Sequence, residues 1–149
     1  MALFLTRRQK LSAFIGALSM AVFGRPVLAH ADQAAVDQLI GQFAGGRKPA
    51  AGRVKLELPA SNEVGSAIEV SVSMEAPPGK YATDVLLVTD GNKKPDIVTF
   101  HFSPMSVVEA TTRIRLAPGA QGVTAVARLN DGSCYAITKV VTVTKAGCV

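Results

Sequence analysis

From residue 53 onward, short stretches with the alternation of β-strands follow one another, and a turn signal separates each stretch from the next. The turns recur about every 8–12 residues, which is the spacing of small sandwich folds rather than of helical or α/β domains. The expected strands lie at residues 53–58, 67–74, 83–89, 97–102, 110–116, 122–129 and 133–144. This pattern predicts an all-β fold, an immunoglobulin-like β-sandwich of about seven or eight strands.

Three segments carry this signal most clearly. The even-numbered residues from Ile68 to Met74 are apolar and alternate with more polar ones, which predicts a strand with one buried face. The continuous apolar run at 85–88 is typical of a buried strand. Asn130-Asp131-Gly132 is a strong hairpin signal between the last two expected strands.

A short amphipathic helix is expected before the strands. Asp32 can serve as its N-cap, apolar residues recur at helical spacing, and the Gly45-Gly46 pair ends it. The expected organisation is therefore a leader at 1–31, a helix and linker at 32–52, a sandwich domain at 53–144 and a flexible C-terminal arm at 145–149.

Residues 1–31 have the three parts of an export signal peptide. A basic start around Arg7 and Arg8 precedes the apolar run, and Ala29 and Ala31 form the small-x-small cleavage pattern, so the mature chain is expected to begin at residue 32. The run is shorter than the roughly 20 apolar residues that a membrane span requires, so no stable membrane anchor is expected. An uncleaved N-terminal anchor is the alternative.

The export route and the destination follow from the same leader. Arg7-Arg8 resembles the twin-arginine export signal, and Arg25 close to the cleavage region favours that route over general secretion. Lys10 departs from the twin-arginine pattern, which usually has an aromatic residue there. The mature protein is expected in the periplasm, an oxidising compartment.

The basic composition of the chain belongs mostly to this leader. The whole chain has 16 Lys and Arg against 11 Asp and Glu. Four of the basic residues and none of the acidic ones lie in the first 31 positions, so the remainder has 12 against 11, a net charge of +1. Tryptophan is absent and aromatics make up 5%, which leaves few platforms for base stacking. A nucleic-acid partner is therefore not expected.

Few residues after the leader have catalytic or metal-binding chemistry. His101 is the only histidine there, and strand alternation places it on the sheet surface, on the face opposite Phe100 and Phe102. A cupredoxin-like copper site needs a cysteine, two histidines and an axial ligand, which this histidine cannot supply. The sequence therefore predicts neither an enzyme nor a bound metal or cofactor.

The two cysteines, Cys134 and Cys148, are expected to stay apart. A strand over 133–144 places its ends about 33 Å apart, whereas the four steps from residue 144 to Cys148 reach back about 14 Å. A disulfide needs Cα atoms within about 7 Å. Cys148 is then an exposed thiol on the arm. Cys134 is interpreted as a small apolar strand residue, and an intersubunit disulfide or a redox role are its alternatives.

Several segments together resemble the SoxY family of sulfur carriers. They are the Arg-Arg leader, the short helix, residues 96–104, 112–116, 123–127 and 131–133, and Gly147-Cys148. The resemblance covers nearly the whole chain and implies a non-catalytic carrier that holds sulfur intermediates covalently on Cys148. It also implies a complex with a SoxZ-like subunit, and the sulfur-oxidising Sox enzymes of thiosulfate oxidation as partners.

The arm of this chain departs from the Gly-Gly-Cys-Gly-Gly arm of that family. Ala146 replaces the first glycine, Val149 follows the cysteine, and Lys145 stands just outside the motif. Two interpretations stay open: a divergent working carrier, or a relative recruited to another periplasmic oxidation pathway. From the residues alone, a non-enzymatic exported sandwich module that uses Cys148 for an intermolecular disulfide is a further alternative.

Overall fold

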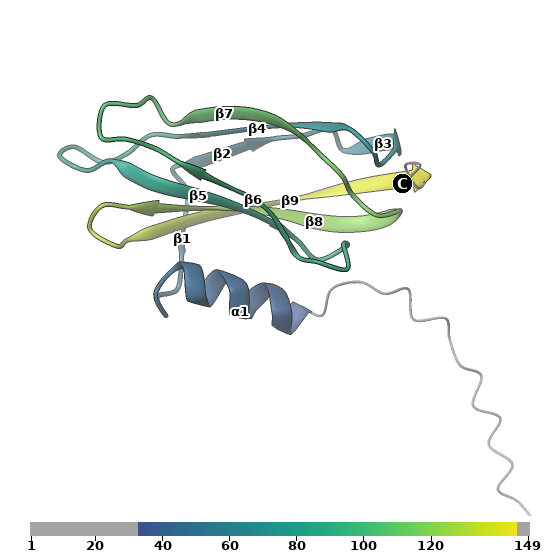
Figure 1. The fold of residues 1–149 in the computed structure, drawn as a ribbon, viewed down its shortest axis with the longest axis horizontal. Coiled ribbons are helices and arrows are strands. Elements are labelled where there is room, and N and C mark those ends of the chain that lie inside the picture. Colours follow the sequence, from purple (N-terminus) through teal and green to yellow (C-terminus); the bar gives the residue numbers. More distant parts are fainter. Residues whose placement is uncertain (1–32, 146–149) are drawn as a thin grey trace, which may run out of the picture.

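Two β-sheets face one another in the computed structural model, which describes residues 33–145 (Figure 1). The larger sheet has the strand order β1-β9-β8-β5-β6, with β3 also paired to β9, and the smaller sheet has the order β2-β4-β7. The larger sheet contains β1 (Ala50–Ala51), β3 (Ser61–Val64), β5 (Ala82–Thr89), β6 (Asp96–His101), β8 (Gly119–Leu129) and β9 (Cys134–Lys145). The smaller sheet contains β2 (Val54–Glu57), β4 (Ile68–Met74) and β7 (Glu109–Ile114). The expected all-β sandwich is confirmed.

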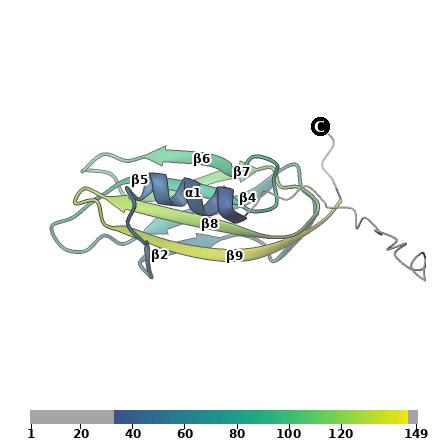
Figure 2. The ribbon, with the colours of Figure 1, turned by 90° about the horizontal axis from the view of Figure 1, so that it is seen from below.

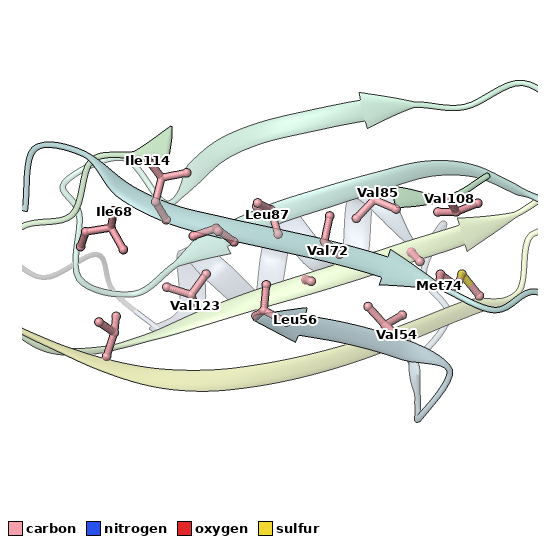
Figure 3. Close-up of a cluster of buried hydrophobic side chains, with 14 of the residues drawn as sticks. Val54, Leu56, Ile68, Val72, Met74, Val85, Leu87, Val108, Ile114 and Val123 are labelled. Carbon is pink, nitrogen blue, oxygen red and sulfur yellow. The ribbon is translucent and has the colours of Figure 1, made fainter. Parts of the chain in front are cut away.

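The inward faces of the two sheets meet in one apolar core (Figure 3). Alternate residues of β2 and β4 point into it, as their sequence pattern predicts. The fully buried side chains include Leu56, Ile68, Val72, Val85, Leu87 and Val123. Burial of each such side chain contributes about 1.5–3 kcal/mol, so this core is the main source of the stability of the sandwich.

Helix α1 (Gln33–Phe43) lies across the outer face of the larger sheet (Figure 2). Its buried Val36 packs against Leu86 and Val88 of β5. The opposite face of β5 points into the sandwich core through Val85 and Leu87. The apolar run at 85–88 is therefore continuous because β5 is covered on both faces, by the smaller sheet and by the helix.

Glycines in the left-handed backbone region end two elements where the sequence predicts. Gly45 and Gly46, with φ of 61° and 77°, follow the helix and stop it. Gly132, with φ of 79°, turns the β8–β9 hairpin, in which the Leu129 N–H donates to the Ser133 carbonyl oxygen at 2.9 Å. These are conformations that a residue with a Cβ adopts at a cost.

The chain from residue 50 to residue 64 borders both sheets in turn. β1 pairs in parallel with the beginning of β9, β2 crosses to the smaller sheet, and β3 returns to pair in parallel with the end of β9. The structure differs here from the expectation. Residues 50–51 form a strand within the expected linker, β3 has no counterpart among the expected strands, and Lys145 is the last residue of β9. Pairing with a distant strand overrides weak local patterns.

The helix and all seven expected strands are present, each within three residues of the predicted bounds. No helix within residues 33–145 is long and apolar enough to cross a membrane. The predicted export-signal residues and the predicted N-cap lie outside the described residues: Arg7, Arg8, Ala29, Ala31 and Asp32.

Candidate functional site

The chemistry predicted from the sequence centres on the arm at 145–149, and the structure describes its first residue, Lys145. The other predicted arm residues lie outside the described residues: Ala146, Gly147, Cys148 and Val149. The described structure therefore defines how the arm is attached. We call residues 142–145, the last four of β9, the arm root.

Strands on both sides hold the arm root. β3 pairs with it in parallel, and β8 pairs antiparallel with its first two residues. The Thr144 hydroxyl lies 3.4 Å and 3.3 Å from the carbonyl oxygens of Asn62 and Glu63, so it donates to the β3 backbone. A chain end without such pairing frays, whereas this one is fixed to the sandwich as far as Lys145.

Gly65 joins the arm root to the loop that follows β7. Its N–H donates to the Lys145 carbonyl oxygen at 3.2 Å, and its own carbonyl oxygen accepts from the Leu116 N–H at 2.9 Å. A Cβ on residue 65 would collide with the Leu116 carbonyl oxygen and would stand 3.1 Å from a Val143 methyl carbon. Glycine is therefore the residue that lets these three backbone segments meet.

Side-chain hydrogen bonds fix the two loops beside the arm root. Asn92, between β5 and β6, donates to the Arg115 carbonyl oxygen at 2.8 Å and accepts from the Ala117 N–H at 2.8 Å. The buried Gln121 accepts from the Thr89 hydroxyl at 2.8 Å and donates to the Ala117 carbonyl oxygen at 2.6 Å. Both loops lie at the end of the sandwich where β9 ends (Figure 1), which makes this end one hydrogen-bonded unit.

Cys134 lies at the other end of β9. The strand continues unbroken from Cys134 to Lys145, which at about 3.3 Å per residue separates them by roughly 36 Å. Cys134 is free, is 5% exposed and packs with Ala44 and Val126 beneath the end of α1. Burial raises the pKa of its thiol, and the nearby charge of Arg128 offsets part of that effect. The interpretation of Cys134 as a small apolar strand residue agrees with this burial.

The sequence patterns missed one polar cluster, on the outer face of the larger sheet. The Asp84 carboxylate accepts hydrogen bonds from Arg128 Nη2 at 2.5 Å and Thr83 Oγ1 at 2.8 Å, and it lies 2.5 Å from His101 Nδ1. Burial raises the pKa of Asp84, but the hydrogen bonds outweigh burial and hold the pKa below its ordinary value. Arg128 also donates to the Phe43 carbonyl oxygen at 3.2 Å. The cluster thus fastens the end of α1 to the sheet, and His101 is exposed as predicted.

In the part of the chain that the structure describes, residues 33–145, no three His, Cys, Asp or Glu side chains gather so as to hold a metal ion. The fold defines the class of protein: a two-sheet β-sandwich whose last strand, β9, ends at Lys145, three residues before Cys148 in the sequence. The model of a protein family described as sulfur oxidation protein SoxY matches residues 40–148. The chain belongs to the SoxY family, and the resemblance in its sequence is confirmed.

Solved structures share the fold. The structure of the sulfur carrier protein SoxY from Chlorobium limicola f thiosulfatophilum is 23% identical with a TM-score of 0.64, and the match covers 76% of this chain and 100% of that one. A superoxide reductase (neelaredoxin) from Ignicoccus hospitalis is 15% identical with a TM-score of 0.53, over 62% of this chain and 80% of that one. A putative superoxide reductase from Thermotoga maritima is 11% identical with a TM-score of 0.52, over 69% of this chain and 91% of that one. At these identities the likeness shows the fold alone. No curated protein matches the chain.

Proposed function

We propose that this chain is a periplasmic sulfur carrier that holds intermediates of sulfur oxidation covalently on Cys148 and presents them to partner enzymes, without catalysing a step itself. The observation that carries the proposal is the match to the SoxY family, which reaches residue 148 and so includes the cysteine. The solved SoxY relative of the same fold is described as a sulfur carrier protein.

The attachment of the arm supports a tethered thiol. Lys145 is held by β3 and by Gly65, so the point from which the arm starts is fixed. Three residue steps separate Lys145 from Cys148, which limits the distance between their Cα atoms to about 11 Å. A partner enzyme that docks at this end of the sandwich therefore meets the cysteine in a small volume, at a high effective concentration.

The chemistry divides between the carrier thiol and its partners. Joining the Cys148 sulfur to the outer sulfur of thiosulfate forms one sulfur–sulfur bond, breaks the S–H bond and releases a proton and two electrons. The electrons pass to an electron-accepting partner enzyme. Addition of water to the terminal sulfonate by a hydrolytic partner breaks the second sulfur–sulfur bond, releases sulfate and leaves a persulfide on Cys148. The carrier supplies the attachment atom, and the partner enzymes supply the oxidising and hydrolytic steps.

The burial of Cys134 supports a single loading site on each chain. The thiolate is the nucleophilic form of cysteine, and burial raises the pKa of this thiol, so it stays protonated. At 5% exposure Cys134 is also closed to a partner enzyme. Sulfur loading at Cys148 therefore proceeds without competition from the second cysteine.

Export and a partner subunit complete the proposal. The Arg7-Arg8 pair and the Ala29-His30-Ala31 pattern support transport by the twin-arginine route and cleavage before Asp32. Family membership supports a complex with a SoxZ-like subunit and the presentation of sulfur adducts to the Sox enzymes of thiosulfate oxidation. The mass of the protein isolated from periplasm tests the export step, because a chain that retains residues 1–31 would contradict it.

Intact-mass analysis tests the carrier function. The complex with the SoxZ-like subunit is incubated with thiosulfate and the partner enzymes, and the mass of this chain is measured without reduction. We expect a sulfur adduct on the unmodified protein and on Cys134→Ala, the matched control, and none on Cys148→Ser. An adduct that survives Cys148→Ser, or no adduct at all, rejects the proposal. A Cys148-dependent disulfide dimer as the main species would support the intermolecular-disulfide alternative.

A further inference from the structure

Four cationic side chains surround the place where the arm leaves the sandwich. Lys93 and Lys94 belong to the loop between β5 and β6, Arg115 to the loop after β7, and Lys145 to the arm root. All four are exposed. Figure 1 shows that both loops lie at the end of the sandwich where β9 ends. We call these four residues the cationic collar.

Backbone and side-chain hydrogen bonds place the members of the collar relative to one another. Gly65 bonds to the Lys145 carbonyl oxygen on one side and to the Leu116 N–H on the other, which sets Arg115 beside the arm root. Asn92, the residue before Lys93, is bonded to the Arg115 carbonyl oxygen at 2.8 Å. The collar is therefore built on a fixed frame.

No carboxylate within residues 33–145 forms an ion pair with a collar residue. The ion pairs of residues 33–145 join Lys55 with Glu75, Lys80 with Asp131, and Asp84 with His101 and Arg128, and none includes a collar residue. Four carboxylates lie on the adjoining strand ends and turns, Glu63, Glu69, Asp90 and Asp96, and Glu69 stands opposite Arg113 in the β4–β7 pair. The Asp90 carboxylate is engaged by the Gly122 N–H at 2.8 Å, and no ion pair joins Glu63 or Asp96 to a collar cation.

We propose that the cationic collar draws anionic sulfur compounds, the sulfur oxyanions, to the thiol of Cys148. The inference rests on the proposed function, since it concerns the same thiol. The arm keeps Cys148 within about 11 Å of Lys145, which is close to the Debye length of about 8–10 Å at physiological ionic strength. The charge of Lys145 therefore acts at the cysteine, and at low ionic strength, where the Debye length reaches about 30 Å, the other collar cations add to the field that concentrates anions there.

The test compares two thiol reagents in the Cys134→Ala background, where Cys148 is the one cysteine left. One reagent is a dianionic aromatic disulfide, dithiobis-nitrobenzoate, and the other is its uncharged counterpart, dithiodipyridine. Both react with the thiolate, so the rate of the dianionic reagent divided by the rate of the uncharged reagent is independent of the thiolate fraction. We expect Lys93→Gln/Lys94→Gln to lower this ratio about fivefold at low salt, and less than twofold in about 1 M salt.

The matched control removes two charges from the opposite end of the sandwich. Lys48 and Lys55 are exposed, and Lys48 lies just before β1, which pairs beside Cys134 at the far end of β9. Lys48→Gln/Lys55→Gln should leave the ratio within about twofold of the parent, although the net charge changes equally. An unchanged ratio in the collar variant, or an equal fall in the control, overturns the inference. The ratio of reagent rates is measured without sulfur loading, so the collar and the carrier function can fail separately.

Discussion

The contact between Gly65 and the arm root predicts the effect of one added methyl group. In Gly65→Ala the new Cβ lies well inside 3.0 Å of the Leu116 carbonyl oxygen, a separation that real Cβ atoms essentially never go below. The atom it meets belongs to the backbone, and Val143 stands 3.1 Å away on another side. No side-chain rotation can relieve this clash, so the backbone has to move.

The cost follows from the hydrogen bonds that the movement breaks. Gly65 bonds to Lys145 at 3.2 Å and to Leu116 at 2.9 Å, and a shift of about 1 Å takes both out of range. Each bond contributes a net 0.5–1.5 kcal/mol, so Gly65→Ala should lower the free energy of unfolding by about 2 kcal/mol. With a urea dependence of about 2 kcal/mol per M, the midpoint of unfolding should fall by about 1 M.

Urea unfolding followed by circular dichroism measures this shift, with Gly41→Ala as the matched control. Gly41 lies in α1 and has nothing within 4 Å of the added Cβ, so its replacement should raise stability by up to about 1 kcal/mol. Hydrogen exchange should speed up at the amides of Gly65 and Leu116 in the first variant alone. A Gly65→Ala midpoint within about 0.2 M of the parent would refute the close approach at the arm root.

Further predictions concern the sandwich. Arg128→Met should lower the free energy of unfolding by about 2–3 kcal/mol, less than a fully buried pair would lose because Arg128 is 40% exposed; equal urea midpoints would contradict this. Because the folded-state pKa of Asp84 is lowered, its ionised carboxylate stabilises the folded state above the ordinary pKa of 3.8. This stabilisation is lost as the pH falls through the lower folded-state pKa. The stability gap between the parent and Asp84→Asn should therefore narrow as the pH falls below about 3.8, and a constant gap would count against the cluster. Cys134 should react with thiol reagents at least about a hundredfold more slowly in the native state than in urea, since opening must precede reaction. Leu87→Ala should cost about 2–5 kcal/mol, as expected for a fully buried leucine.

The sequence predicts the elements in which one face is buried, because burial imposes a period on the residues. β4 alternates buried and more exposed positions from Ile68 to Met74, and its pattern alone locates it. β3 carries no such period. Its residues, Ser61 to Val64, are exposed or half-buried, and they form a strand because the end of β9 offers backbone partners. A pairing of this kind depends on residues about 80 positions away, which no local pattern contains.

The candidate site likewise contains residues that the sequence predicts and residues that it does not. Cys148 is a prediction from its position in the sequence and from the resemblance to the SoxY family, and the family match bears out the resemblance. The role of Gly65 depends on the approach of Leu116 and Lys145, which a sequence does not show. The ionic cluster of Asp84 and Arg128 joins residues 44 positions apart, on strands that pair through the sheet. Residues that act from one segment leave a pattern in the sequence, whereas residues that only the fold brings together leave none.

The location of the sulfur adduct is the most direct test of the central claim, that Cys148 carries the sulfur and Cys134 does not. Tryptic cleavage after Lys145 releases Cys148 in a peptide that begins at Ala146, whereas Cys134 lies in the peptide of residues 129–139. Digestion of thiosulfate-loaded protein without reduction should show the adduct mass on the first peptide and an unmodified second peptide. An adduct on residues 129–139, or an unmodified arm peptide from protein whose intact mass shows loading, would contradict the account.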